Sequence, residues 1–248
     1  MMRILLLGGT TEASRLADTI AAAGIDAVFS YAGRTNTPVA QPLPTRIGGF
    51  GGIDGLVRFL ITERITHVID ATHPFAAGMT RNAFAACQSV NLPLIRFERP
   101  AWVAGIADNW TMATAVEDIP ALLPDMPTQV FLAIGKQQIG LFASKPQHHY
   151  LLRLVDHPAA PIALPDKTIV VARGPFDQQG DTELLKAHGI THVVAKNSGG
   201  TGAQAKLEAA RALGLPVIMA NRPDVPGRSL ASIRDVMSWL GHEAERGV

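Results

Sequence analysis

A glycine-rich turn near the amino terminus has the residue types needed to bind a charged ligand. The turn Gly8-Gly9-Thr10-Thr11-Glu12-Ala13 follows the apolar run Arg3–Leu7 and precedes a segment with helical spacing. Small residues let the backbone approach a pyrophosphate, and the N–H groups at a helix start attract its charge. The turn departs from G-x-G-x-x-G, so a tight strand-to-helix turn without a ligand is the alternative. We expect a dinucleotide site formed by Gly8, Gly9, Thr10, Thr11 and Glu12.

The end of the next apolar run indicates which dinucleotide would bind. A site for NAD usually has Asp or Glu about 20 residues after the glycines, where it binds the ribose 2′-hydroxyl. The run Ala27–Tyr31 ends without a carboxylate, and Asp26 lies at its other end. Ser30, inside this run, and Arg34, just after it, suit a 2′-phosphate instead, although Arg34 could also be a solvated loop charge. The sequence therefore favours NADPH over NADH, bound through Ser30, Tyr31, Ala32, Gly33 and Arg34.

A third turn, Ala71-Thr72-His73-Pro74-Phe75-Ala76, again joins a predicted strand to a predicted helix. Proline suits the first position of a helix, because that position needs no N–H donor. In a doubly wound sheet this turn lies beside the glycine turn. We therefore expect Thr72, His73 and Pro74 to contact the pyrophosphate or the nicotinamide ribose. A histidine beside a proline is more often structural than catalytic, so we assign His73 to binding and leave proton transfer open.

The second half of the chain has cations at or after the ends of predicted strands. Because the carboxyl ends of parallel strands meet at one edge of a sheet, these cations could together bind several carboxylates of one substrate. Each of them alone would be an ordinary surface charge. A desolvated lysine near other cations can have a lowered pKa, so Lys136, or a bound water, is the candidate donor if the reaction needs a proton. The predicted substrate-binding residues are Lys136, Arg153, Arg173, Lys196 and Ser198.

These turns require a framework of alternating strands and helices. Short apolar β-branched runs do alternate with helix-period segments, which is typical of a parallel sheet covered by helices. The segment that begins Ile65-Thr66-His67-Val68 recurs as Ile190-Thr191-His192-Val193. We therefore expect an α/β protein made by internal duplication, with two Rossmann-like parallel-sheet domains facing a central cleft. The predicted domains are residues 1–117, which bind NADPH, and residues 128–248, which form the substrate side, with a Pro-rich linker at 118–127.

Composition excludes several other classes of protein. The chain has 248 residues, 47% of them hydrophobic, and a net charge of +1, which gives no argument for nucleic acid. No apolar run approaches the length of a membrane span. Cys87 is the only cysteine, no Cys/His spacing suggests a metal site, and there is no G-x-S-x-G motif. We expect a cytoplasmic protein with a small-molecule substrate and no membrane partner, and leave its oligomeric state open, a monomer included.

Together these motifs resemble the precorrin-6A reductase family of cobalamin biosynthesis. The matching segments are the glycine turn, the turn after Ala71, the segment Arg96-x-Glu98-Arg99-Pro100-x-Trp102, Gly174-Pro175-Phe176 and Lys196-x-Ser198-Gly199-Gly200. The resemblance implies NADPH-dependent reduction of precorrin-6A to precorrin-6B by hydride transfer, with no covalent catalytic residue. It also implies two Rossmann-like domains that exchange strand material.

Three alternatives stay open at this point. Relatives in the family act on the cobalt-bearing substrate, and no motif in this sequence separates the two substrates. A fold does not determine its chemistry, so the chain could instead be an NADP(H)-binding regulator without catalytic activity. It could also be an NADPH-dependent reductase of another polycarboxylate.

Overall fold

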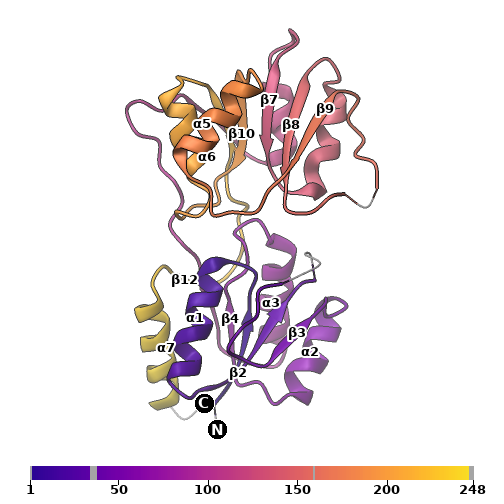
Figure 1. Ribbon diagram of the computed structural model, residues 1–248. Coiled ribbons are helices and arrows are strands. Elements are labelled where there is room, and N and C mark those ends of the chain that lie inside the picture. Colours follow the sequence, from indigo (N-terminus) through magenta and orange to yellow (C-terminus); the bar gives the residue numbers. More distant parts are fainter. Residues whose placement is uncertain (1, 34–37, 159, 246–248) are drawn as a thin grey trace. The chain divides into compact units, whose positions relative to one another are not determined.

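The computed structural model describes residues 2–33, 38–158 and 160–245, which form two compact units (Figure 1). Unit 1 spans Met1–Pro100 and Asp224–Val248, and unit 2 spans Ala101–Pro223. These limits differ from the predicted boundaries at residues 117 and 128. The stretch 118–127, predicted as a linker, lies inside unit 2.

This stretch forms regular structure despite its prolines. It contains the end of the 3-10 helix η1 (Val116–Asp118) and the short helix α4 (Ile119–Leu122). Pro120 lies in the first turn of α4, where a missing N–H breaks no hydrogen bond. The prolines at 120, 124 and 127 are therefore compatible with a packed segment and do not mark a linker.

Unit 1 is built on a six-stranded parallel sheet whose strand order reverses once. The reversal falls between its two central strands, which makes the carboxyl ends of β1 and β4 a topological switch point, where such sheets bind ligands. Along the sheet the strands are β12 (Ser229–Leu230), β5 (Leu94–Phe97), β4 (His67–Asp70), β1 (Arg3–Leu7), β2 (Asp26–Tyr31) and β3 (Thr45–Ile47).

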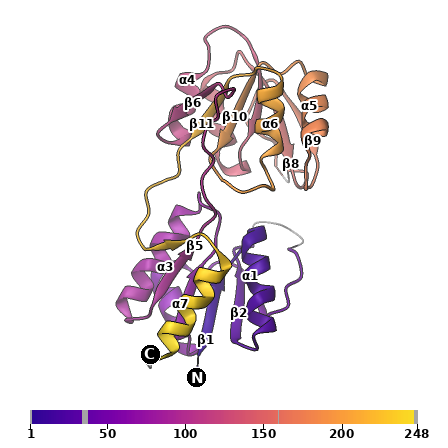
Figure 2. The same cartoon turned by 90° about the vertical axis from the view of Figure 1, so that its left-hand side faces the viewer.

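Helices cover both faces of this sheet. Helices α1 (Thr11–Ala22) and α7 (Ile233–Glu245) lie on the face that is turned toward the viewer in Figure 2. Helices α2 (Gly52–Thr62) and α3 (Ala77–Ser89) lie on the other face (Figure 1). Side chains of β1 alternate between the two layers, since Ile4 and Leu6 pack in the cluster with α1 and α7, and Leu5 and Leu7 in the cluster with α2 and α3. Burial on both faces explains why this strand is a continuous apolar run.

Unit 2 repeats the same strand order in a second six-stranded parallel sheet. Helices α5 (Gln178–Ala187) and α6 (Ala205–Ala212) pack in its core, and the 3-10 helix η2 (Lys136–Ser144) follows the strand equivalent to β1. The two predicted Rossmann-like parallel sheets are thereby confirmed, and their shared order agrees with duplication. Along the sheet the strands are β6 (Trp110–Ala113), β11 (Val217–Ala220), β10 (His192–Lys196), β7 (Gln129–Ala133), β8 (His149–Leu154) and β9 (Lys167–Val171).

The two sheets exchange their sixth strands. Strand β6 comes directly after β5 in the sequence, but it pairs with β11 in the sheet of unit 2. Strand β12 comes directly after β11, but it pairs with β5 in the sheet of unit 1. These two strands have equivalent positions at the sheet edges. As a result, unit 1 is assembled from both ends of the chain.

One histidine is buried at the amino-terminal edge of the unit 2 sheet. His148 is fully buried, and it lies close to the backbone of Pro124. Burial lowers the pKa of His148, and the positive charge of Lys145 acts in the same direction. The pKa of His192, on β10, is also lowered by burial. Both imidazoles therefore favour the neutral form in the folded protein.

We expect unit 2 to lose stability as the pH falls from about 7 to 5, because the unfolded chain binds protons that the folded chain excludes. For each histidine with a lowered pKa, the loss approaches about 1.4 kcal/mol per pH unit below the unfolded pKa of about 6.5. His148→Phe keeps a ring beside Tyr150 and cannot be protonated, so it should reduce this slope in urea unfolding at a series of pH values. His157→Phe, at an exposed position, is the control, and equal slopes for both variants would contradict the prediction.

Candidate functional site

The glycine turn after β1 requires glycine at both of its first two positions. A Cβ atom added to Gly8 would lie 2.1 Å from the ring atom Cζ of Phe29, which is fully buried. The N–H of Gly8 donates to the carbonyl of Ser30 at 2.9 Å, which holds the turn against β2. Gly9 has a φ of +121°, a conformation that other residues rarely adopt. The turn is therefore a closely packed backbone loop, as a pyrophosphate site needs.

Thr10 caps helix α1 with its side chain. Its hydroxyl oxygen accepts from the N–H of Ala13 at 3.1 Å and donates to the carbonyl of Ala71 at 3.0 Å. The single hydroxyl proton of Thr10 is used in this way. The N–H groups of Thr11 and Glu12 have no acceptor in the described part of the chain, as expected at a helix start. These backbone donors are the part of the turn best suited to an anion.

The carboxylate of Glu12 forms an ion pair with Arg99, whose side chain is 15% exposed. A lone carboxylate at this helix start would repel a pyrophosphate, and the pairing with Arg99 balances its charge. Sequence reasoning noticed Arg99 only as part of a motif and did not pair it with Glu12. In the same motif, Arg96 forms an ion pair with Glu98.

The end of β2 differs from the prediction in the residues that it presents. Ser30 is buried, and its hydroxyl accepts a hydrogen bond from Arg46 on β3 at 2.9 Å. The hydroxyl of Tyr31 donates to the carbonyl of Val39 at 2.9 Å, so it holds the following loop. Ala32 and Gly33 are exposed, and Arg34 lies outside the described residues. Arg46 was not foreseen, because β3 was not predicted as a strand.

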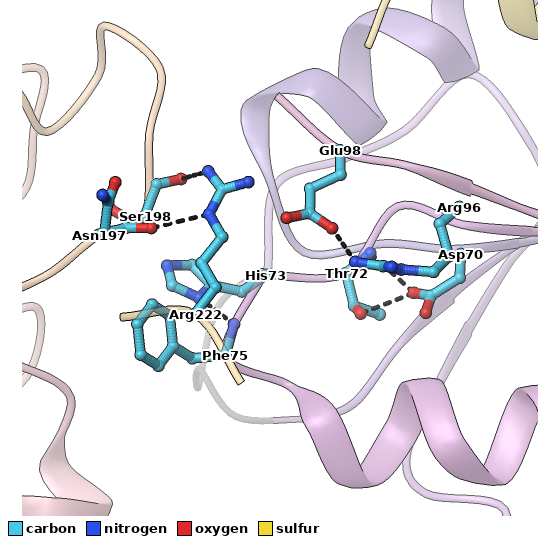
Figure 3. A network of polar contacts seen from close by, with 9 residues as sticks. All are labelled: Asp70, Thr72, His73, Phe75, Arg96, Glu98, Asn197, Ser198 and Arg222. Carbon is cyan, nitrogen blue, oxygen red and sulfur yellow. Dashed lines mark hydrogen bonds and ion pairs between the residues drawn. The ribbon is translucent and has the colours of Figure 1, made fainter. Parts of the chain in front are cut away.

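The turn after β4 lies beside the glycine turn, as the bond from Thr10 to Ala71 shows. The carboxylate of Asp70 is buried and accepts from both the N–H of Thr72, at 3.1 Å, and its hydroxyl, at 2.6 Å (Figure 3). His73 is exposed, and its Nδ1 accepts from the N–H of Phe75 at 3.2 Å. In the neutral imidazole the proton is then on Nε2. Pro74 is buried and completes the turn.

Three of the predicted cations of unit 2 follow or end strands at the carboxyl edge of its sheet. Lys136 is exposed and contributes to the wall of a cavity of about 410 Å³, together with apolar residues such as Ile139 and Ile162. Lys196 ends β10 and is half-buried, and burial lowers its pKa while the carboxylate of Glu117 opposes that shift. Arg173 is exposed, with its guanidinium 3.7 Å from the carboxylate of Asp156.

The fourth cation, Arg153, already has a counter-ion inside unit 2. Its guanidinium contacts both carboxylate oxygens of Asp181, with the Nη2 to Oδ2 distance at 3.3 Å. It also lies 3.6 Å from the ring centroid of Phe176. The side chain of Asp181 is only 3% exposed. Arg153 therefore has a structural role that the sequence did not reveal.

The predicted residue Ser198 is buried in a loop held by the side chains of Arg222, Asn197 and Trp102. Arg222 donates from Nε to the carbonyl of Asn197 at 2.9 Å and from Nη2 to that of Ser198 at 3.2 Å (Figure 3). The Asn197 side chain exchanges two hydrogen bonds with the backbone of Trp102. The indole N–H of Trp102 donates to the carbonyl of Gly200 at 2.8 Å. The sequence signals for these contacts were the two family motifs that contain Trp102 and Ser198.

Comparison with known proteins gives consistent matches over nearly the whole chain. The family model described as Precorrin-6x reductase CbiJ/CobK matches residues 3–241. The chain is 61% identical over 241 residues to a precorrin-6A reductase of Rhodobacter capsulatus, which covers 97% of this chain and 96% of the relative. It is 45% identical over 244 residues to a precorrin-6A reductase of a Sinorhizobium species, covering 96% and 94%.

The solved structure of a CobK precorrin-6A reductase superposes on this chain with a TM-score of 0.94 at 60% sequence identity. The match covers 98% of this chain and 97% of the solved chain. Within the described residues, none of the helices combines the length and apolar character needed to cross a membrane.

Proposed function

Since the chain belongs to the precorrin-6x reductase family, we propose that it reduces precorrin-6A to precorrin-6B with NADPH in cobalamin biosynthesis. Members of this family are oxidoreductases of the tetrapyrrole pathway, and such reductases use a nicotinamide cofactor. The observation that carries the proposal is the turn Gly8–Thr11. It places unpartnered backbone N–H groups at the switch point of a sheet with dinucleotide-binding strand order.

The residues of unit 1 fit a dinucleotide. The packing of Gly8 against Phe29 leaves no side chain between the backbone and a pyrophosphate, and α1 directs its amino terminus at the same place. The ion pair with Arg99 removes the repulsion that Glu12 would cause. The neighbouring turn at Thr72 and His73 would support the nicotinamide ribose. Bound there, NADPH would supply the hydride, and the protein would supply orientation and charge.

The cations of unit 2 fit a substrate with several carboxylates. Precorrins have a rim of acetate and propionate groups, which lysine and arginine bind through charge-assisted hydrogen bonds. Lys136 and Arg173 are exposed at the carboxyl edge of the sheet, and Lys196 is half-buried there. Arg153 would bind a substrate carboxylate while it keeps its contact with Asp181. Ser198 would bind the substrate from the loop that Arg222 holds. Proton delivery would come from Lys136 or from a water.

A two-step titration tests this function. NADPH is first titrated into the protein with fluorescence detection, and precorrin-6A or its cobalt complex is then added while nicotinamide absorbance is followed. We expect tighter binding of NADPH than of NADH, and loss of NADPH absorbance only after precorrin-6A is added. Tight binding of NADPH without turnover would indicate a regulator. Turnover only with another polycarboxylate would rule out precorrin-6A as the substrate. Turnover with the cobalt complex alone would assign the chain to the cobalt-dependent members.

A further inference from the structure

Arg46 lies beside the carboxyl end of β2, although it comes from another strand. It is the central residue of the edge strand β3 and is paired in register with Ser30 of β2. Neutral groups hold its guanidinium. Nη1 donates to the hydroxyl of Ser30 at 2.9 Å and to the carbonyl of Gly48 at 2.8 Å, and Nη2 donates to the carbonyl of Gly49 at 3.1 Å.

This arrangement leaves one edge of the guanidinium for a ligand. An arginine has five N–H donors, and the contacts above use three of them. The Nε proton and one Nη2 proton have no acceptor among residues 2–33, 38–158 and 160–245. The nitrogens Nε and Nη2 share one edge of the planar group, and the spacing of that edge suits two phosphate oxygens. The guanidinium lies 3.9 Å from the ring centroid of Phe50, which fixes its plane.

The charge of Arg46 has no counter-ion within the described part of the chain. Two other partly buried arginines do have one, since Arg99 pairs with Glu12 and Arg153 with Asp181. Among the described residues Arg46 contacts neutral oxygens and aromatic rings, and burial lowers its pKa. A partly desolvated cation without a carboxylate is unfavourable by itself, and a bound anion would balance it.

The position identifies the anion. In sheets of this strand order the end of β2 lies at the adenosine ribose, and an arginine there accommodates the 2′-phosphate of NADP. Ser30 is only 4% exposed, so it is better placed to orient Arg46 than to bind the ligand itself. We propose that Arg46, positioned by Ser30 and Phe50, binds the 2′-phosphate of NADPH and sets the preference for NADPH over NADH. This inference rests on the proposed function.

The variant Arg46→Gln tests the assignment by binding alone, without substrate. Loss of a charge-assisted contact should lower the affinity for NADPH about 10- to 100-fold and leave the affinity for NADH within about twofold of wild type. The affinity for adenosine 2′,5′-bisphosphate, which has the 2′-phosphate, should fall to the same extent as that for NADPH. The affinity for 5′-AMP, which lacks this phosphate, should not change. Arg58→Gln, at an exposed position on α2, is the matched control and should change neither ligand. Affinities are measured by calorimetry, and folding by thermal melting.

Two milder variants keep the test decisive if Arg46→Gln does not fold. Arg46→Lys keeps the charge but loses the paired donors, and Ser30→Ala removes only the hydrogen bond that orients the guanidinium. Both variants should lower the affinity for NADPH more than the affinity for NADH. An equal loss for NADPH and NADH would show that Arg46 only supports the loop, and would overturn the inference. Unchanged NADPH preference in the variants would overturn it while the proposed function stands. A wild-type protein that binds both cofactors equally would overturn the NADPH preference itself.

Discussion

Asp181→Ala should destabilise unit 2 by about 3–5 kcal/mol, because it leaves the guanidinium of Arg153 buried without a counter-ion. The side chains of Asp181 and Arg153 are 3% and 11% exposed, so solvent cannot replace the lost carboxylate. Urea unfolding gives the free energy when it is followed by the fluorescence of Trp102 and Trp110. Both tryptophans lie in unit 2, and Trp239→Phe removes the signal of unit 1.

Two further variants separate the buried pair from ordinary surface charge. Asp125→Ala breaks the ion pair with Lys145, but the Asp125 side chain is 98% exposed, so the loss of stability should be far smaller than in Asp181→Ala. Replacing both Arg153 and Asp181 by Leu removes the unpaired charge and should recover much of the stability. A loss in Asp181→Ala no larger than that in Asp125→Ala would mean that the pair contributes as little as a surface contact.

Gly8→Ala should destabilise unit 1 by about 1–3 kcal/mol or more and lower the affinity for NADPH at least about tenfold. The new methyl group would lie 2.1 Å from Phe29, whose ring is fully buried in the core and cannot move away. The turn must therefore shift, and the backbone N–H groups proposed to bind the pyrophosphate shift with it. Thermal melting gives the stability, and fluorescence titration gives the affinity for NADPH.

Two other glycines show whether contact or backbone conformation is responsible. In Gly9→Ala the new methyl group meets no atom within 4 Å, so any loss of stability comes from the φ of +121° at this position. Gly78→Ala lies in helix α3 with no atom within 4 Å, and alanine there should stabilise by up to about 1 kcal/mol. A melting temperature of Gly8→Ala that matches Gly78→Ala would refute the packing argument, and Phe29→Leu should partly rescue Gly8→Ala.

The central strands could be predicted from the sequence because both of their faces are buried. Leu5 on β1, Ile69 on β4 and Val194 on β10 are each 0% exposed, and their strands are continuous apolar runs. The strands β3, β6 and β12 were missed because they lie at sheet edges and have no such run. Ile47 on β3 is 58% exposed and Met112 on β6 is 44% exposed. An edge strand is defined by the neighbour that it pairs with, which sequence spacing does not reveal.

The same limit applies to the candidate site. The turns after β1 and β4 were predicted because small residues, threonine and proline at a strand end have local conformational meanings. The ion pair of Glu12 with Arg99 joins positions 87 residues apart, and that of Arg153 with Asp181 joins positions 28 apart. No local pattern contains either pair. The position of Arg46 beside Ser30 depends on the register of β2 and β3, which is known only once β3 has been identified as a strand.

The exchange of sixth strands has a consequence for biosynthesis on the ribosome. All six strands of unit 2 are available once residue 223 has been translated, whereas β12 and α7 of unit 1 come only afterwards. Val236 and Leu240 of α7 are buried against the same cluster as Ile4 and Leu6, so until they emerge the earliest-made core stays open on one face. We expect the half that is synthesised later to complete its fold first, which reverses the usual vectorial order of domain folding.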